Sequence, residues 1–131
     1  MIGLDTNILV RAFAADDPIQ TELSTRLLDS SEPGALYVNV IVLVEFAWTM
    51  RRLFRWDEAR LRVALERIAG HPALVIEKRA CVLEAIAGSN SGAPNFADKL
   101  IGALNREDGC ETTLTFDRDA AKDEDFRLFS C

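Results

Sequence analysis

The sequence has little histidine and little cysteine. His71 is the single histidine, so a zinc site or a Ser-His-Asp triad would depend on it alone, and both are disfavoured. The three cysteines, Cys81, Cys110 and Cys131, are an odd number without metal-type spacing. Cys81 and Cys110 lie in apolar stretches and are expected to pack as small hydrophobic residues. This cysteine usage favours a reducing cytoplasm.

Long apolar runs are also missing. None reaches the roughly 18 residues that a membrane span needs, and the N-terminus has neither the basic region nor the cleavage site of a signal peptide. We therefore expect a cytoplasmic protein that does not enter a membrane. The net charge of −6 counts against a nucleic-acid binder that works by a basic surface alone. It does not exclude a nuclease whose acids bind metal, and it suits a basic partner.

The 131-residue length and 49% hydrophobic content predict one α/β domain over residues 1–131. Asp17 and Pro18 are typical of a helix start, with Gln20 completing a capping box and Ile19, Leu23 and Leu27 forming the apolar stripe. Strands and helices alternate, which indicates a parallel sheet covered on both faces. Strands are predicted at 2–5, 35–38, 73–76, 111–116 and 126–130, with helices at 18 onward, 40–53, 58–70, 78–87 and 96–108. Asn39, Asp57 and Asn95 are predicted to cap the helices that follow them, and Gly109 is predicted to end the last helix. The apolar stripe of the helix at 58–70 is predicted to be Leu61, Leu65 and Ile68. Residues 88–94 are predicted to form a flexible loop.

Four acids stand in apolar contexts where carboxylates are rarely buried without a partner or a metal: Asp5, Glu45, Asp98 and Asp117. Asp5 and Asp117 end predicted strands, and Glu45 lies on the first two turns of the helix after the second strand. Asp98 lies on the first turn of its helix. The carboxyl ends of parallel strands share one edge, so we expect the four to converge there. Carboxylate oxygens suit Mg²⁺ or Mn²⁺, which can hold a phosphate and activate water.

Each acid also has a simpler interpretation. Asp5 fits a turn or cap, and Glu45 fits a solvated helix position, although its apolar neighbours predict a helix buried nearly all round. Asp98 stands three residues after Asn95, the capping-box spacing, and Asp117 fits an N-cap. The shared sheet edge is what favours the functional interpretation.

The ordered motifs around these acids resemble PIN-domain ribonucleases, specifically the VapC-type toxins of bacterial toxin–antitoxin pairs. The matching segments are residues 3–11, 16–20, 42–48, 95–101, 109–110 and 114–117. The resemblance implies a three-layer α/β/α domain with a five-stranded parallel sheet in the order 3-2-1-4-5. It implies a magnesium-dependent endoribonuclease that hydrolyses RNA phosphodiesters with metal-activated water, Mn²⁺ being the alternative ion. It further implies a homodimer and inhibition by a cognate antitoxin.

The resemblance assigns a role to each matching residue. Asp5 and Asp98 are implied as the principal metal ligands, with Glu45 an acid near the metal or its water and Asp117 completing the set. The supporting polar residues are Thr6, Asn7 and Thr115.

Three positions depart from the family pattern. Asn95 stands where many relatives have Asp, and we interpret it as a helix cap. Gly102 stands where Ala is usual. Lys99 replaces a residue that is commonly small, and we expect it to face solvent.

Several residues are candidates for contacts outside the acids. Arg11 and Arg118 are the better candidates for substrate phosphate. The basic and aromatic run 51–56 could bind RNA, but Phe54 and Trp56 are more readily core residues. Trp48, Phe13 and Phe54 are candidates for a partner surface.

Alternative functions are less well matched. A haloacid-dehalogenase-like phosphatase requires a second Asp two residues after the nucleophile, where this chain has Asn7. A response-regulator receiver requires an Asp on its middle strand, and none is found there. The non-enzymatic alternative is a catalytically weak PIN-like module whose acids hold a structural metal or dock a basic partner.

Overall fold

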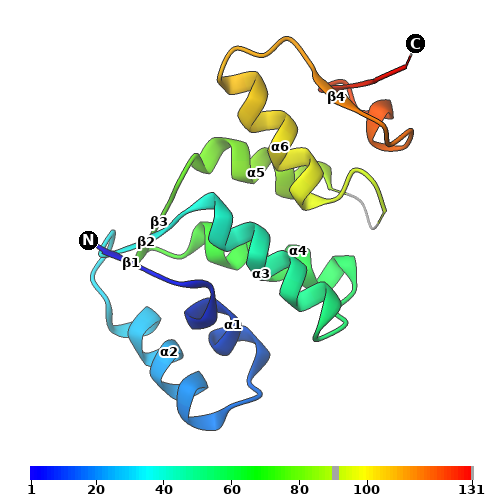
Figure 1. The fold of residues 1–131 in the computed structure, drawn as a ribbon. Coiled ribbons are helices and arrows are strands. Elements are labelled where there is room, and N and C mark those ends of the chain that lie inside the picture. Colours follow the sequence, from blue (N-terminus) through cyan, green and yellow to red (C-terminus); the bar gives the residue numbers. More distant parts are fainter. Residues whose placement is uncertain (90–91, 131) are drawn as a thin grey trace. The chain divides into compact units, whose positions relative to one another are not determined.

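The computed structural model describes residues 1–89 and 92–130. The chain forms two compact units, unit 1 (Met1–Arg79) and unit 2 (Ala80–Cys131), and each is described by itself. Figure 1 shows the elements in chain order, with unit 1 running from blue to green and unit 2 from green to red.

Unit 1 is built on a parallel sheet of β1 (Ile2–Gly3), β2 (Leu36–Val38) and β3 (Leu74–Ile76), in the order β1-β2-β3. Ile2 is in register with Leu36, and Leu36 with Leu74. Leu36 and Val38 of the central strand are almost fully buried. The three expected strands are confirmed, although each is short.

Four helices belong to unit 1: α1 (Thr6–Ala14), α2 (Pro18–Ser30), α3 (Val40–Arg52) and α4 (Glu58–Gly70). The predicted caps are confirmed, since Asp17, Asn39 and Asp57 each accept a hydrogen bond from a backbone N–H of the first helical turn. The predicted stripe Leu61, Leu65 and Ile68 of α4 is buried.

Helix α1 was not predicted, because Asp5-Thr6-Asn7 was interpreted only as a turn or cap. Its buried residues, Thr6, Leu9 and Val10, follow helical spacing. Phe13 continues this face and packs edge-on against Phe46 of α3, with ring centroids 5.7 Å apart. The capping Asp followed by this spacing was the available signal.

The stripe predicted for α2 is wrong. Ile19 is 74% exposed and Leu23 60% exposed, while Ser24 and Leu28 are the buried residues. The predicted capping box is also wrong, because the Gln20 side chain accepts a hydrogen bond from Arg11 Nε instead. Helical spacing identified the helix but selected the wrong face.

Unit 2 contains α5 (Arg79–Gly88, whose first residue closes unit 1), α6 (Phe96–Glu107), β4 (Thr113–Thr115), the 3₁₀ helix η1 (Ala120–Lys122) and β5 (Phe126–Leu128). β4 and β5 pair in parallel, with Thr113 in register with Phe126. Asn95 caps α6, and Gly109 takes positive φ just after it, as predicted. In the loop predicted at 88–94, Asn90 and Ser91 lie outside the described residues.

The expected five-stranded sheet in the order 3-2-1-4-5 is not observed. The described strands form two parallel sheets, one of three strands and one of two. The residue pattern identified the strands correctly, but it does not encode which strand neighbours which. The order rested on the resemblance, and β1 pairs with β2 over only two residues.

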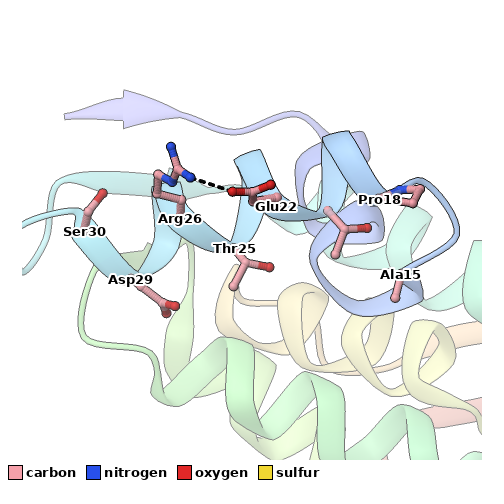
Figure 2. A pocket seen from close by; sticks show the side chains of 8 residues that line it. Ala15, Pro18, Glu22, Thr25, Arg26, Asp29 and Ser30 are labelled. Atoms are coloured by element: carbon pink, nitrogen blue, oxygen red, sulfur yellow. Dashed lines mark hydrogen bonds and ion pairs between the residues drawn. The ribbon is translucent and has the colours of Figure 1, made fainter.

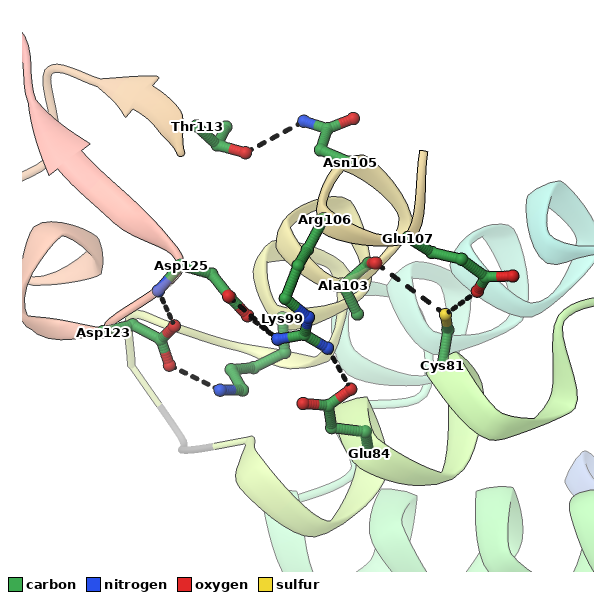
Figure 3. Close-up of polar contacts among 10 residues, drawn as sticks. All are labelled: Cys81, Glu84, Lys99, Ala103, Asn105, Arg106, Glu107, Thr113, Asp123 and Asp125. Atoms are coloured by element: carbon green, nitrogen blue, oxygen red, sulfur yellow. Dashed lines mark hydrogen bonds and ion pairs between the residues drawn. The ribbon is translucent and has the colours of Figure 1, made fainter. Parts of the chain in front are cut away.

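The cysteine predictions are partly wrong. Cys81 is buried as expected, and its Sγ donates to Glu107 Oε2 at 2.7 Å (Figure 3). Burial, followed by this hydrogen bond, raises the pKa of the Cys81 thiol to about 11. Cys110 is exposed, and Cys131 lies outside the described residues.

Gly102 allows α6 and the start of β5 to approach closely. A Cβ at this position would lie 2.9 Å from Phe126 Cε2 and 3.0 Å from Asp125 Cβ. The departure from the usual Ala therefore has a packing reason in this chain.

We predict that Gly102→Ala destabilises the protein. Alanine gains about 1 kcal/mol of helix propensity. Overpacking against two groups costs about 1–3 kcal/mol. We expect a net loss of about 1 kcal/mol in the free energy of unfolding, measured with urea. Gly70→Ala is the control, because its Cβ would meet nothing within 4 Å. Equal or higher stability of Gly102→Ala would contradict the packing argument.

Candidate functional site

Asp5 lies at the carboxyl end of β1, where the strand turns into α1. The Leu4 N–H donates to Tyr37 O at 2.9 Å, so the hydrogen bonding between β1 and β2 continues up to the residue before Asp5. Asp5 has extended backbone (φ −82°, ψ 160°) and caps α1, with Oδ1 accepting from the Thr6 N–H at 2.8 Å. The predicted place of Asp5 is confirmed, and its side chain is exposed.

Glu45 lies on the second turn of α3 and is joined to α1. Thr6 Oγ1 donates to Glu45 Oε1 at 2.8 Å, and Thr6 itself is 9% exposed. Since Thr6 directly follows Asp5, this bond brings two predicted site acids to one region of unit 1. The expectation that α3 is buried nearly all round is wrong, because Glu45 lies on an exposed face with Ile41 and Trp48.

Asp98 lies on the first turn of α6 in unit 2. Its Oδ2 accepts from the Asn95 N–H at 3.0 Å, while its own N–H donates to Asn95 Oδ1 at 2.9 Å. This reciprocal pair is the capping box that the spacing predicted. Asp98 therefore has a structural role in addition to any chemical one.

Asp117 follows β4 and organises the turn into η1. Its Oδ1 accepts from the N–H groups of Asp119 and Ala120 at 2.8 and 3.2 Å. Thr115 Oγ1 accepts from the Asp117 N–H at 3.0 Å, so the predicted supporting residue positions this acid directly. These bonds resemble those of a cap, although the N-cap residue of η1 is Asp119.

The four acids share one pattern. Each uses one carboxylate oxygen as a hydrogen-bond acceptor, and within residues 1–89 and 92–130 the other oxygen has no protein partner. No described lysine or arginine pairs with any of them. Each therefore keeps one hard oxygen ligand available, the donor type that Mg²⁺ or Mn²⁺ prefers.

Burial does not explain these acids. Asp5, Glu45 and Asp117 are exposed and Asp98 is half-buried, so the premise that they occupy apolar sites is wrong. Several of their apolar neighbours in sequence are themselves exposed, including Ile2, Ile41 and Phe116. No group of three or more metal-type side chains is found in the part of the chain that the structure describes. Asp5 and Glu45 belong to unit 1, and Asp98 and Asp117 to unit 2.

The two arginine candidates differ. Arg11 Nη1 contacts both carboxylate oxygens of Asp16, at 2.7 and 2.8 Å, and Arg11 is therefore already neutralised. Arg118 is exposed and has no partner among the described residues. Arg11 also lines a cavity of about 390 Å³ between α1 and α2, together with Asn7, which is exposed.

The aromatic candidates separate into core and surface residues. Trp56 is 6% exposed, which confirms its interpretation as a core residue, and Phe54 is half-buried. Trp48 is 55% exposed, and the Arg52 guanidinium carbon lies 4.9 Å from its ring centroid. Trp48 is thus the exposed aromatic of this set.

Lys99 does not face solvent as expected. It forms an ion pair with Asp123, and both side chains are largely buried (Figure 3). Burial raises the pKa of Asp123, but the hydrogen bond from Lys99 and the backbone N–H of Asp125 outweigh it, so the net pKa lies below its usual value. Nearby, Arg106 bridges Asp125 and Glu84.

A groove of about 670 Å³ follows α2 and holds none of the predicted site residues (Figure 2). Its side chains include the Glu22–Arg26 ion pair and Asp29, from successive turns of the helix. Both partners of that pair are 68% exposed, so it is a surface feature.

The protein is thus an α/β protein in which carboxylate oxygens without a partner among the described residues lie near the starts of helices. Residues 2–124 match the PIN domain family, and the chain belongs to that family. The match spans both units. PIN domains are generally metal-dependent nucleases, and this supports hydrolase chemistry for the chain. A search of curated proteins gives no match. None of the helices in the described residues is both long and apolar enough to cross a membrane.

We predict that Thr6→Val lowers the free energy of unfolding by about 1 kcal/mol, because valine keeps the shape of threonine but cannot donate to Glu45. Thr6→Ser should retain most of the stability. In a Glu45→Ala background, Thr6→Val should cost little more, as a double-mutant cycle by urea unfolding would show. An undiminished cost in that background would mean that the bond contributes nothing.

Proposed function

We propose that this protein is a magnesium-dependent endoribonuclease, the toxin of a type II toxin–antitoxin pair acting in the cytoplasm. The carrying observation is that Asp5 and Glu45, linked through Thr6, each keep an oxygen free of any protein partner in the described residues. The family match supports nuclease chemistry of this kind. Further proposed partners are a second copy of the chain and a cognate antitoxin.

In the proposed site, Asp5 and Asp98 are the residues that would hold the ion. A bound Mg²⁺, or Mn²⁺ in its place, would neutralise phosphate charge and lower the pKa of water. Glu45, oriented by Thr6, accepts a proton from the attacking water. Asp117, held by Thr115, completes the acidic set, while Asn7 is a supporting polar group.

The proposal requires Asp98 and Asp117 to meet Asp5 and Glu45, as they would in a five-stranded sheet of order 3-2-1-4-5. Arg118, which is exposed and unpaired within the described residues, is the better candidate for a phosphate contact. Arg11 would first have to leave Asp16.

A second candidate is a catalytically weak PIN-like module that docks a basic partner. The observation in its favour is that Asp98 and Asp117 already have capping roles, which could retain them without catalysis. Cleavage assays separate the two candidates.

We predict that the purified protein cleaves single-stranded RNA with Mg²⁺ and not with EDTA. Asp5→Asn and Asp98→Asn should each lower the rate at least about 100-fold, comparable to the loss of a general base. Asparagine is an equally good N-cap at position 5, and at position 98 its amide oxygen can still accept from the Asn95 N–H, so these variants should fold. The control is Asp29→Asn, which changes an exposed acid near the end of α2.

Two results would count against this proposal. Unchanged cleavage by both variants would refute the site assignment. Absence of cleavage by the natural sequence across several RNAs would favour the binding module.

We also predict that Asp5 and Asp98 are energetically coupled in metal-free, low-salt buffer. If their carboxylates lie close together, neutralising one relieves the repulsion, so the double Asn variant gains less than the sum of the single variants. The coupling in the free energy of unfolding should exceed about 0.5 kcal/mol, the limit for independent sites.

The control cycle pairs Asp98→Asn with Asp29→Asn and should be additive. Additivity of Asp5→Asn with Asp98→Asn as well would show that the two acids do not converge.

A further inference from the structure

Helix α3 carries an exposed face that continues from Glu45. Ile41 and Trp48 are 67% and 55% exposed, and Glu45 and Arg52 are exposed as well. The spacing of these positions, four, three and four residues, aligns them on one side of the helix. The opposite side holds the buried Val42, Leu43, Phe46, Ala47 and Met50.

Trp48 and Arg52 form a pair with the chemistry of a nucleotide contact. The Arg52 guanidinium carbon lies 4.9 Å from the Trp48 ring centroid. Arg52 has no acidic partner among the described residues, so its charge is available on a chain of net charge −6. Trp56 also has an arginine over its ring, Arg60 at 4.3 Å, but that ring is 6% exposed and belongs to the core.

The distance along α3 fits a neighbouring nucleotide. Three residues separate Glu45 from Trp48, a rise of about 4.5 Å. Stacked nucleotides in one strand of duplex DNA advance about 3.4 Å. The two spacings are similar, so a strand that ran along α3 from Glu45 would bring a neighbouring base near Trp48.

We propose that Trp48 and Arg52 bind the nucleotide next to the cleaved phosphate, with its base stacked on the indole and its phosphate contacting the guanidinium. The occupant is single-stranded RNA, because only an unpaired base offers its face to the ring. The unneutralised charge of Arg52 favours a phosphate over an apolar protein surface. This inference rests on the proposed function, since it takes the substrate to be RNA bound at Glu45.

The test is binding of an unstructured, fluorescently labelled ten-nucleotide RNA to the full chain, followed by anisotropy, both in EDTA and with Ca²⁺ in place of Mg²⁺. Trp48→Ala should weaken binding roughly 5- to 150-fold, the range for loss of one stacked base. Trp48→Phe should keep most of the affinity, because phenylalanine also stacks. Val63→Ala, which removes an exposed apolar side chain of α4, should leave affinity unchanged.

Intrinsic fluorescence gives a second readout, since the chain has two tryptophans. RNA should quench the emission of the natural sequence and not that of Trp48→Phe, where only the buried Trp56 remains. An RNA of equal length whose bases are replaced by abasic sites should quench much less, which separates stacking from charge.

Three outcomes would overturn the inference. The natural sequence does not bind RNA, or Trp48→Ala binds RNA with unchanged affinity, or Trp48→Ala changes only the oligomeric mass of the protein in sedimentation. The last would assign the face to a second copy of the chain. If cleavage depends on metal and on Asp5 but Trp48→Ala binds RNA normally, this inference is wrong and the proposed function stands. Trp48-dependent binding without any cleavage supports the stacking contact and refutes the nuclease proposal.

Discussion

The starts of the helices depend on side-chain oxygens that accept backbone N–H groups, and the candidate site uses the same interactions. Asp5 opens α1, and Asp98 closes a capping box at α6. A cap fixes one oxygen against the helix, and this orients the other oxygen away from that bond. Negative charge is also stabilised at a helix N-terminus, so an unpaired carboxylate is tolerated there. The caps thus preorganise these two acids without any cation from the protein.

Unit 2 shows how a lysine near the acids is kept from neutralising them. Lys99 directly follows Asp98, yet its ammonium is bound by Asp123. The side chain passes close to Gly88, where an added Cβ would lie 2.6 Å from Lys99 Cε. The close approach of Phe126 to Gly102 positions the segment that carries Asp123 and Asp125. Packing and ion pairing therefore direct the positive charge toward β5, while Asp98 keeps its free oxygen.

Much of the fold could be predicted from local signals. Asn39, Asp57 and Asn95 marked helix starts correctly, because capping is a contact between residues two or three positions apart. The face of α2 could not be predicted this way, since Ile19 and Leu23 have the right spacing but lie on the exposed side. Strand order failed for the same reason: pairing is a long-range property that apolar patterning does not record.

The site acids were identified for a reason that the structure corrects. Burial would have required a metal to compensate for desolvation, but Asp5, Glu45 and Asp117 are exposed. Because the carboxylates are exposed, they remain hydrated and need no counter-ion to be stable. The metal-free fold therefore does not have to bury charges that repel one another. A hydrogen bond such as that from Thr6 to Glu45 contributes about 1 kcal/mol and orients an exposed carboxylate. The same exposure leaves Trp48, one turn further along α3, open to whatever binds at Glu45.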